Sequence, residues 1–351
     1  MRRWSVLLKL TGSLLGLVLS AVTPAPAQGN GIPTLRVYTN VVQVPTLVLS
    51  GGLKPLPPIS ASRFFVSIDD GTRFRVTHAR VEGNDPLALG ILVDANHLPE
   101  ATEAGLQESI AGLAQNSVHG NDKVSVYSMS CKLTRGIAEQ PTNVENLRKV
   151  TAALFGEGKK QEKEKCEHPW KLLDAIAAAV EGFDQNSGRR VLLVLTSGED
   201  LGSKLSWDQV RRLAQIKGVA IFAIEPQQDF VVPPAGRGGI GLSDTAVAAT
   251  NMPSLCESTG GLLLDSSRDS AAEKLRQAVA LVRGRYIIEF PSPAAAAGQH
   301  KMTITVEKMR AFIRPAGISI LPLDPSLAKD PNTFLPDPAN APEVGKRPPK
   351  Q

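Results

Sequence analysis

The sequence has few cysteines, few aromatic residues and no excess of either charge large enough to define a function. Only three of its 351 residues are cysteines, and aromatic residues make up 5%. Three cysteines cannot form the dense disulfide framework of a small secreted domain. A content of 42% hydrophobic and 21% charged residues also argues against a disordered or collagen-like chain. A chain of this length is expected to form about two domains, one of them with a well-buried core.

Acidic residues are missing from the start of the chain, where the first one is Asp69. The formal charge of +5 therefore owes much to Arg2, Arg3 and Lys9, and residues 28–351 carry a net charge of only +2. A charge this small gives no support to a nucleic-acid partner.

The first 27 residues have the features of a secretory signal. Arg2 and Arg3 are followed by the apolar segment Leu10–Val22 and by Ala25–Ala27, a cleavage site with small residues. The apolar run is shorter than the roughly 20 residues that span a bilayer, although an uncleaved membrane anchor remains the alternative. No later segment is apolar enough to cross a membrane. The sequence predicts a secreted or periplasmic protein with no transmembrane segment in the mature chain.

Both flanks of the mature chain are rich in predicted strands. Residues 28–84 form an N-terminal β segment, in which predicted strands at Arg63–Ile68 and Arg73–Val81 flank a hairpin turn at Asp69–Gly71, because an Asp-Gly pair tolerates positive φ. Residues 285–322 form a C-terminal β segment whose last predicted strand is Ala311–Leu321. This segment is expected to pair with the first one in a β-sandwich, since domain termini often lie close together. Residues 323–351 contain seven prolines and are predicted to be a disordered tail.

Residues 85–284 alternate between apolar strands and helical repeats. The runs Leu87–Val93, Val191–Leu195 and Val219–Ile224 are apolar throughout, as expected of strands that are buried on both faces. Amphipathic segments separate them, and one of these begins with a capping box formed by Ser206 and Gln209. This order predicts an α/β fold, a doubly wound and mainly parallel sheet with Rossmann-type connections.

Several motifs could indicate catalysis or cofactor binding but lack the necessary context. Gly236–Gly241 fits a dinucleotide-binding pattern, yet it follows two prolines instead of a strand. Ser197 follows a buried strand without the Gly-x-Ser-x-Gly elbow of a hydrolase. The five histidines have no metal-ligand spacing. No cofactor is therefore predicted.

One set of segments resembles a known family in its order and spacing. Its members lie within about residues 35–322, and they are Phe65–Gly71, Leu89–Asp94, Leu173–Ile176, Arg189–Asp200, Ser258–Gly261 and Leu281–Tyr286. Together they resemble von Willebrand factor A domains and, more narrowly, the VWFA-related secreted proteins of acidobacterial type. The resemblance implies an A-type α/β domain whose ligands bind beyond the carboxyl ends of the strands.

The resemblance also implies a divalent-cation site for adhesion, and this chain departs from it. Asp94 matches the first carboxylate of the Asp-x-Ser-x-Ser motif, whereas Asn96 and Leu98 stand at its two serines. Trp170 occupies the position of the distant threonine, and Ser197 that of the distant aspartate. A hard cation needs several oxygen ligands, which Leu98 and Trp170 cannot supply. The site is predicted to be degenerate and to hold no metal.

The resemblance favours a non-enzymatic interaction or adhesion module that binds a protein or cell-envelope partner without metal. Two alternatives stay open. One is a hydrolase or other enzyme that uses the same carboxyl edge, and the other is a metal-dependent adhesion domain with altered ligands. An enzyme would bring a nucleophile, a base and an orienting group together, and Asp94, His97 and Ser197 match no known arrangement.

The cysteines suggest one disulfide bond if the protein meets oxidising conditions outside the cytoplasm. Cys131 closes a predicted strand at the carboxyl edge, and Cys166 lies in the loop that carries the metal-site threonine in an active A domain. Cys131 and Cys166 are therefore expected to pair. Cys256 lies in a predicted helix and is expected to be a buried free thiol. The alternative is three reduced cysteines.

Overall fold

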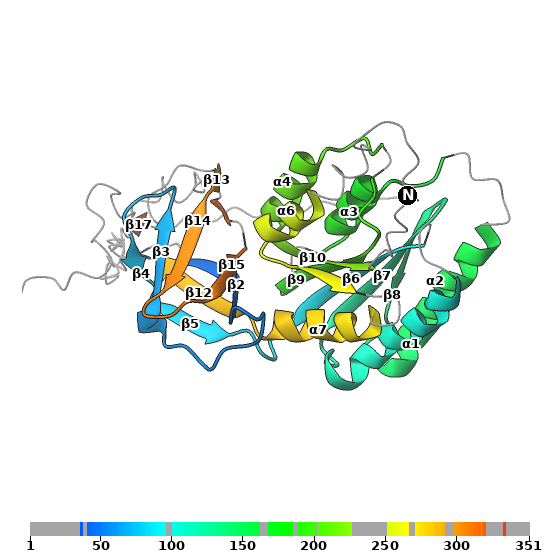
Figure 1. Cartoon of the computed structure of the whole chain (residues 1–351), viewed down its shortest axis with the longest axis horizontal. Coiled ribbons are helices and arrows are strands. Elements are labelled where there is room, and N and C mark those ends of the chain that lie inside the picture. The colour runs from blue at the N-terminus through cyan, green and yellow to red at the C-terminus, as the bar shows by residue number, and fades with distance from the viewer. Residues whose placement is uncertain are drawn as a thin grey trace, which may run out of the picture.

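The computed structural model describes residues 36–37, 41–95, 100–161, 168–184, 189–200, 202–226, 251–266, 271–291, 298–316, 318–320 and 333–334. These residues form two lobes, one built of α-helices and strands and the other mainly of strands (Figure 1). The second lobe also contains one 3₁₀ helix, η1 (Ala61–Arg63). The predicted signal segment 1–27 and the glycine-rich motif 236–241 lie outside the described residues.

A six-stranded sheet forms the centre of the α/β lobe. Its strand order is β11-β10-β9-β6-β7-β8, and every neighbouring pair is parallel except β7 and β8. The bounds are β6 (Leu87–Asp94), β7 (Lys123–Met129), β8 (Leu133–Ile137), β9 (Arg189–Leu195), β10 (Val219–Pro226) and β11 (Leu263–Ser266). All eight residues of β6 are buried, as the unbroken apolar run of a strand covered on both faces requires.

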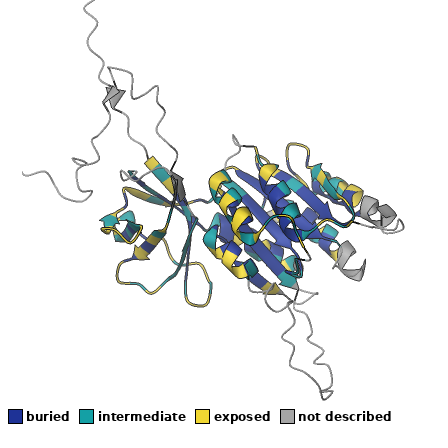
Figure 2. Cartoon of the chain, turned by 90° about the horizontal axis from the view of Figure 1, so that it is seen from above, coloured by how far each residue is buried: buried dark blue, intermediate teal, exposed yellow. Residues whose placement is uncertain are grey.

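Helices cover both faces of this sheet (Figure 1), and the strands of the sheet are coloured as buried over most of their length (Figure 2). One layer consists of α1 (Glu100–Asn116), α2 (Val144–Gln161) and α7 (Ala271–Arg283), which pack against Ile91 and Leu193. The other consists of α3 (Leu172–Glu181), α4 (Trp207–Lys217) and α6 (Asn251–Ser258), which pack against Leu92 and Leu192. The protein is thus a mixed α/β protein with a mainly parallel sheet.

Helix α4 shows how the local sequence sets the ends of an element. The Ser206 side chain accepts a hydrogen bond from the Gln209 amide, and the Gln209 side chain accepts one from the Ser206 amide. Gly218 ends the helix with φ of 61°, a conformation that glycine adopts without steric cost. The capping box that the sequence indicates is confirmed.

In the β lobe, strands from the two flanks of the chain pair with each other in both of its larger sheets. One sheet has the order β15-β2-β12-β5 and another has the order β14-β3-β4. The strands are β2 (Val41–Leu49), β3 (Phe64–Ile68), β4 (Phe74–Arg75), β5 (His78–Val81), β12 (Tyr286–Pro291), β14 (Met302–Val306) and β15 (Phe312–Pro315). The two sheets share a core that includes Val44, Phe64, Ile288 and Ile304. The flanks therefore pair with each other strand by strand.

Two strands that the sequence suggested as continuous are divided. The segment predicted as one strand from Arg73 to Val81 forms β4 and β5, which belong to different sheets. The crossing is fixed at Thr77, whose amide and hydroxyl both donate to the Glu289 carbonyl, at 2.8 and 2.7 Å. Likewise, the segment predicted as Ala311–Leu321 forms β15 and a separate strand, β16 (Ile318–Ile320), which pairs with β13 (Gly298–His300).

Two residues of the proline-rich segment 323–351 are described, and the prediction of a disordered tail is not tested by them. Within it, β17 (Thr333–Phe334) pairs in parallel with β1 (Arg36–Val37). The other residues of this segment lie outside the described part of the chain. A proline has no amide proton to donate, but neither residue of β17 is a proline, so both can donate backbone hydrogen bonds.

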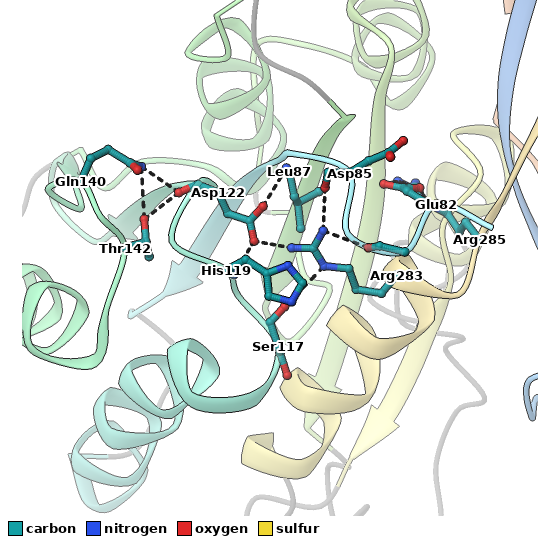
Figure 3. A network of polar contacts seen from close by, with 11 residues as sticks. Glu82, Asp85, Leu87, Ser117, His119, Asp122, Gln140, Thr142, Arg283 and Arg285 are labelled. Atoms are coloured by element: carbon teal, nitrogen blue, oxygen red, sulfur yellow. Dashed lines mark hydrogen bonds and ion pairs between the residues drawn. The ribbon is translucent and has the colours of Figure 1, made fainter. Parts of the chain in front are cut away.

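Two buried ion pairs lie where the chain passes between the lobes (Figure 3). Arg285 donates from Nε and Nη2 to the two carboxylate oxygens of Glu82, at 3.0 and 3.1 Å. Both side chains are at most 1% exposed. In addition, the Glu82 amide donates to the Arg285 carbonyl at 2.7 Å. The outgoing and returning segments of the chain are thus bonded to each other directly.

Asp122 forms the second ion pair of this junction and also accepts hydrogen bonds from the backbone. Its Oδ1 accepts the Leu87 amide at 2.9 Å, and its Oδ2 accepts both the His119 amide at 2.7 Å and the Arg283 guanidinium. Arg283 also donates to the carbonyls of Gly83 and Asp85, at 3.2 and 2.7 Å. Since Leu87 begins β6 and Asp122 precedes β7, this network lies at the amino end of the sheet. The β lobe is attached there, and the carboxyl end points away from it.

Candidate functional site at the carboxyl edge of the sheet

Parallel strands bring four polar segments to the carboxyl edge. β6 ends at Asp94, β7 is followed by Ser130, β9 is followed by Thr196, and β10 carries Glu225 near its end. β6 pairs with β7 on one side and with β9 on the other. The first three segments are therefore neighbours, as expected for a ligand site of a doubly wound sheet.

Asp94 is buried at this edge with a hydroxyl group against its carboxylate. Its residue is 1% exposed, and the Thr196 hydroxyl donates to Oδ2 across 3.2 Å. The same hydroxyl oxygen accepts the Gly198 amide at 3.1 Å. A carboxylate with a hydrogen-bond donor can remain buried without an ion beside it. The arrangement accounts for Asp94 as a part of the strand-end packing.

Glu225 lies against the turn that follows β9. A Cβ atom added to Gly198 would lie 2.7 Å from Glu225 Oε1, and Gly198 has φ of 81°, so only glycine fits at this position. Burial, and then the negative charge of Asp265 on the adjacent strand, raise the pKa of Glu225 to about 7. Glu225 was not among the predicted site residues. Its position directly after the apolar run Val219–Ile224 is the sequence feature that could have placed it at the carboxyl edge.

Trp170 stands on the rim of the same edge, where the sequence analysis placed it. Its amide donates to the Ser130 carbonyl at 3.0 Å, and the residue is 38% exposed. The start of α3, next to it, is held by the loop that follows β9: Ser203 Oγ accepts the amides of Leu173 and Asp174 and donates to Asp200 at 2.5 Å. An indole is thus presented to solvent from a backbone that is fixed on both sides.

Three of the five positions of the predicted cation site, Asp94, Trp170 and Ser197, lie within the described residues. The Trp170 side chain has no oxygen ligand, and the Thr196 hydroxyl donates to one oxygen of the Asp94 carboxylate. Within the described part of the chain, no group of three or more His, Cys, Asp or Glu side chains is placed to hold a metal ion. Asn96 and Leu98 lie outside the described residues, so their predicted contribution is not tested.

The arrangement also offers little for nucleophilic catalysis. Ser197 is half-buried, and the hydrogen bond found at its Oγ within the described residues comes from the Glu199 amide at 3.5 Å. A serine nucleophile requires a base within about 2.6–3.2 Å of its hydroxyl. His97, the histidine nearest to Asp94 in sequence, lies outside the described residues.

The cysteine prediction is tested only in part. Cys256 is a free thiol in α6, 1% exposed, and burial raises its pKa to about 12. The expectation of a buried free cysteine is confirmed. Cys166 lies outside the described residues, so its pairing with Cys131 stays a prediction.

The chain matches no protein-family model and no curated protein. Among solved structures, it is similar to proximal thread matrix protein 1 from the mussel byssus, with 14% identity and a TM-score of 0.40 over 67% of this chain. It spans only 50% of that mussel protein.

Among the described residues, no helix has the length and apolar character needed to cross a membrane.

Two bacterial proteins show similarity of the same order. The conserved hypothetical protein BatB from Bacteroides thetaiotaomicron is 14% identical with a TM-score of 0.34, covering 56% of this chain and 98% of BatB. The pilus adhesin SpaC from Lactobacillus rhamnosus GG is 9% identical with a TM-score of 0.37, covering 78% of this chain and 48% of SpaC. Similarity at this level carries no functional argument, so the function has to be inferred from the site.

Proposed function

We propose that the chain is an exported, non-enzymatic interaction module of von Willebrand A type, which binds a protein or cell-envelope partner through the carboxyl edge of its sheet without metal. The flanking strands form a single supporting β-domain in this proposal. The observation that carries it is Trp170, a large side chain presented at the rim from a fixed backbone.

Tryptophan is enriched among the residues that dominate protein interfaces, because its large surface is buried at a small cost in conformational entropy. Trp170 is exposed to 38%, and its amide is held by the Ser130 carbonyl. Such an anchor requires little ordering upon binding, and this favours affinity. Binding loops on a rigid scaffold are the usual place of recognition in α/β proteins.

The proposal of metal independence follows from the same residues. In the family that the sequence resembles, a cation at this edge contributes to adhesion. Here Trp170 occupies the position of one ligand, and the hydroxyl of Thr196 contacts the Asp94 carboxylate. The partner is then recognised by apolar and hydrogen-bonding groups instead of a shared ion.

The test compares binding of envelope extracts by the protein and by Trp170→Ala, with Ile216→Ala as the matched control. Ile216 is also an exposed apolar residue, 62% exposed, but it lies in α4 away from the rim. We expect the wild type and Ile216→Ala to retain the same envelope proteins in equal amounts, with or without EDTA. Trp170→Ala should not retain these proteins. Retention that survives Trp170→Ala, or that EDTA abolishes, contradicts the proposal.

A further inference from the structure

A small cavity, half open to solvent, lies between α4 and α6 in one helical layer of the α/β lobe. Its volume is about 190 Å³, and the two helices supply its lining: Trp207, Asp208, Arg211, Asn251, Ser254 and Leu255. Figure 1 shows the two helices side by side. None of these residues takes part in the contacts described for Trp170 at the rim.

The walls of this cavity are held in place from both ends. Leu255 is 2% exposed and packs into the core beneath it. The Gln215 side chain donates to the Ser258 carbonyl at 2.8 Å and so fastens the end of α4 to the end of α6. The capping box of Ser206 and Gln209 fixes the turn that carries Trp207. The cavity is therefore pre-formed, which lowers the cost of binding.

The polar groups that line the cavity balance in charge and differ in hydrogen-bonding character. Asp208 forms ion pairs with Arg211 and, at 2.7 Å, with Arg212. The hydrogen bond from Arg211 lowers the pKa of Asp208, so its carboxylate stays ionised at neutral pH and acts as an acceptor. Arg211 has only donors, whereas the amide of Asn251 and the hydroxyl of Ser254 can both donate and accept.

This combination restricts the class of ligand. An anion would meet the carboxylate of Asp208, and a cation would meet the guanidinium of Arg211. The volume of about 190 Å³ is below the roughly 300–1,000 Å³ of sites for drug-sized ligands. A small neutral ring with several hydroxyl groups matches both the donors and the acceptors, and the indole of Trp207 offers an apolar surface for its C–H face.

We propose that this cavity binds a single neutral pyranose unit, with its C–H face on Trp207 and its hydroxyl groups on Asp208, Arg211 and Asn251. Such a site is a second recognition surface, and it goes beyond the proposed role of the carboxyl edge. Because the pyranose site uses other residues, the result of its test does not depend on whether Trp170 binds a partner.

The test is a titration of the full chain without its predicted signal segment. Glucose, galactose and N-acetylglucosamine are the probes, and binding is followed by saturation-transfer NMR and by tryptophan fluorescence. We expect saturable binding of at least one of the three sugars. Asn251→Ala should weaken it about tenfold, which corresponds to about 1.4 kcal/mol. Trp207→Ala should abolish it.

Matched variants separate a binding defect from a folding defect. Trp207 also packs against the core, so the melting temperature of Trp207→Ala is measured first, and Asn251→Ala tests the same site from the other helix. Ile216→Ala in α4 and Trp170→Ala at the rim should bind sugar as the wild type does. Maltotriose, compared with glucose, tells whether a free sugar or a unit of a polysaccharide is preferred.

Three results would overturn the assignment. The first is the absence of saturable binding for all three neutral sugars. The second is binding that Asn251→Ala and Trp207→Ala leave unchanged. The third is tighter binding of glucose 6-phosphate than of glucose, since the Asp208 carboxylate should disfavour an anion.

Discussion

The two ends of the same parallel sheet use buried carboxylates in different ways. At the amino end, the Glu82 carboxylate binds Arg285, and the Asp122 carboxylate binds Arg283 and two backbone amides. Both arginines come from the segment that returns to the β lobe. At the carboxyl end, Asp94 meets a hydroxyl group, and Glu225 packs against a glycine turn. The amino end therefore joins two lobes by ion pairs, whereas at the carboxyl end the described contacts of Asp94 include the hydroxyl group of Thr196.

This difference separates the end of the sheet that joins the two lobes from the end that we propose binds a partner. A charged network that is satisfied on all sides and covered by a second lobe cannot be reached by a partner. The rim around Asp94 is not covered by the β lobe and presents Trp170 to solvent.

The largest effect is expected from Glu82→Gln at the amino end. It removes the charge that faces Arg285 and leaves a buried guanidinium without a counter-charge, which should lower the free energy of unfolding by about 3–5 kcal/mol. Urea denaturation measures it. The control is Asp70→Asn, which breaks an exposed pair with Lys301 and should cost about 0–1 kcal/mol. Equal losses in the two variants would remove the contrast.

The disulfide is the next largest effect, and it concerns the carboxyl end. The Trp170 amide bonds to the carbonyl of Ser130, the residue directly before Cys131, and Trp170 follows Cys166 by four positions in the sequence. A bond that closes about 35 residues should contribute roughly 3–4 kcal/mol in the chain-entropy model, so Cys166→Ser should lower the free energy of unfolding by that amount. Peptide mapping without reductant should find Cys131 linked to Cys166. A linked peptide that contains Cys256, or none at all, contradicts the pairing.

Glu225 should make the carboxyl end sensitive to pH. Its pKa is raised to about 7 in the folded chain, above the 4.5 of a free glutamate, chiefly by burial. The folded state therefore binds a proton that the unfolded state has lost, and stability should fall as pH rises from about 4.5 to 7. Melting temperatures across this range should show the decline. Glu225→Gln should flatten it, and an unchanged slope in that variant would assign the effect to another group.

The smallest expected effect is that of divalent cations. Magnesium, calcium or manganese at millimolar levels should leave the melting temperature unchanged, because a ligand shifts stability only when it prefers the folded state. Differential scanning fluorimetry with and without EDTA checks this. A clear rise that disappears in Asp94→Asn would show that the carboxyl end binds metal after all, whereas a nonspecific ion effect would persist in that variant.

Sequence patterns predict elements whose whole length is apolar or strongly capped. The strands at Leu87, Val191 and Val219 and the capped start of α4 are where the sequence indicates them. β8 was not predicted, since only one of its faces is covered and its residues Leu133–Ile137 are partly or fully exposed. A half-covered edge strand gives neither an apolar run nor a clean alternation.

The same limit applies to the sites. Asp94, Trp170 and Ser197 could be placed at one edge because parallel strands end together. The partners of buried charges could not be predicted, since Arg283 lies 161 residues from Asp122 and no local pattern connects them. The cavity between α4 and α6 is likewise formed by residues whose spacing along the chain carries no signal.

The position of β12 has a consequence for how the protein is made. β12 lies between β2 and β5, both of which precede it by more than 200 residues; the Gln43 side chain bonds that of Glu289, 246 positions later. At about 5–20 residues per second, a ribosome needs roughly 10–50 s to cover that distance. During this time β2 and β5 lack the strands that pair with them, and their edges are exposed. The nascent chain must therefore be kept from aggregating until its last third is synthesised, and the α/β lobe can complete its own sheet before the β lobe closes.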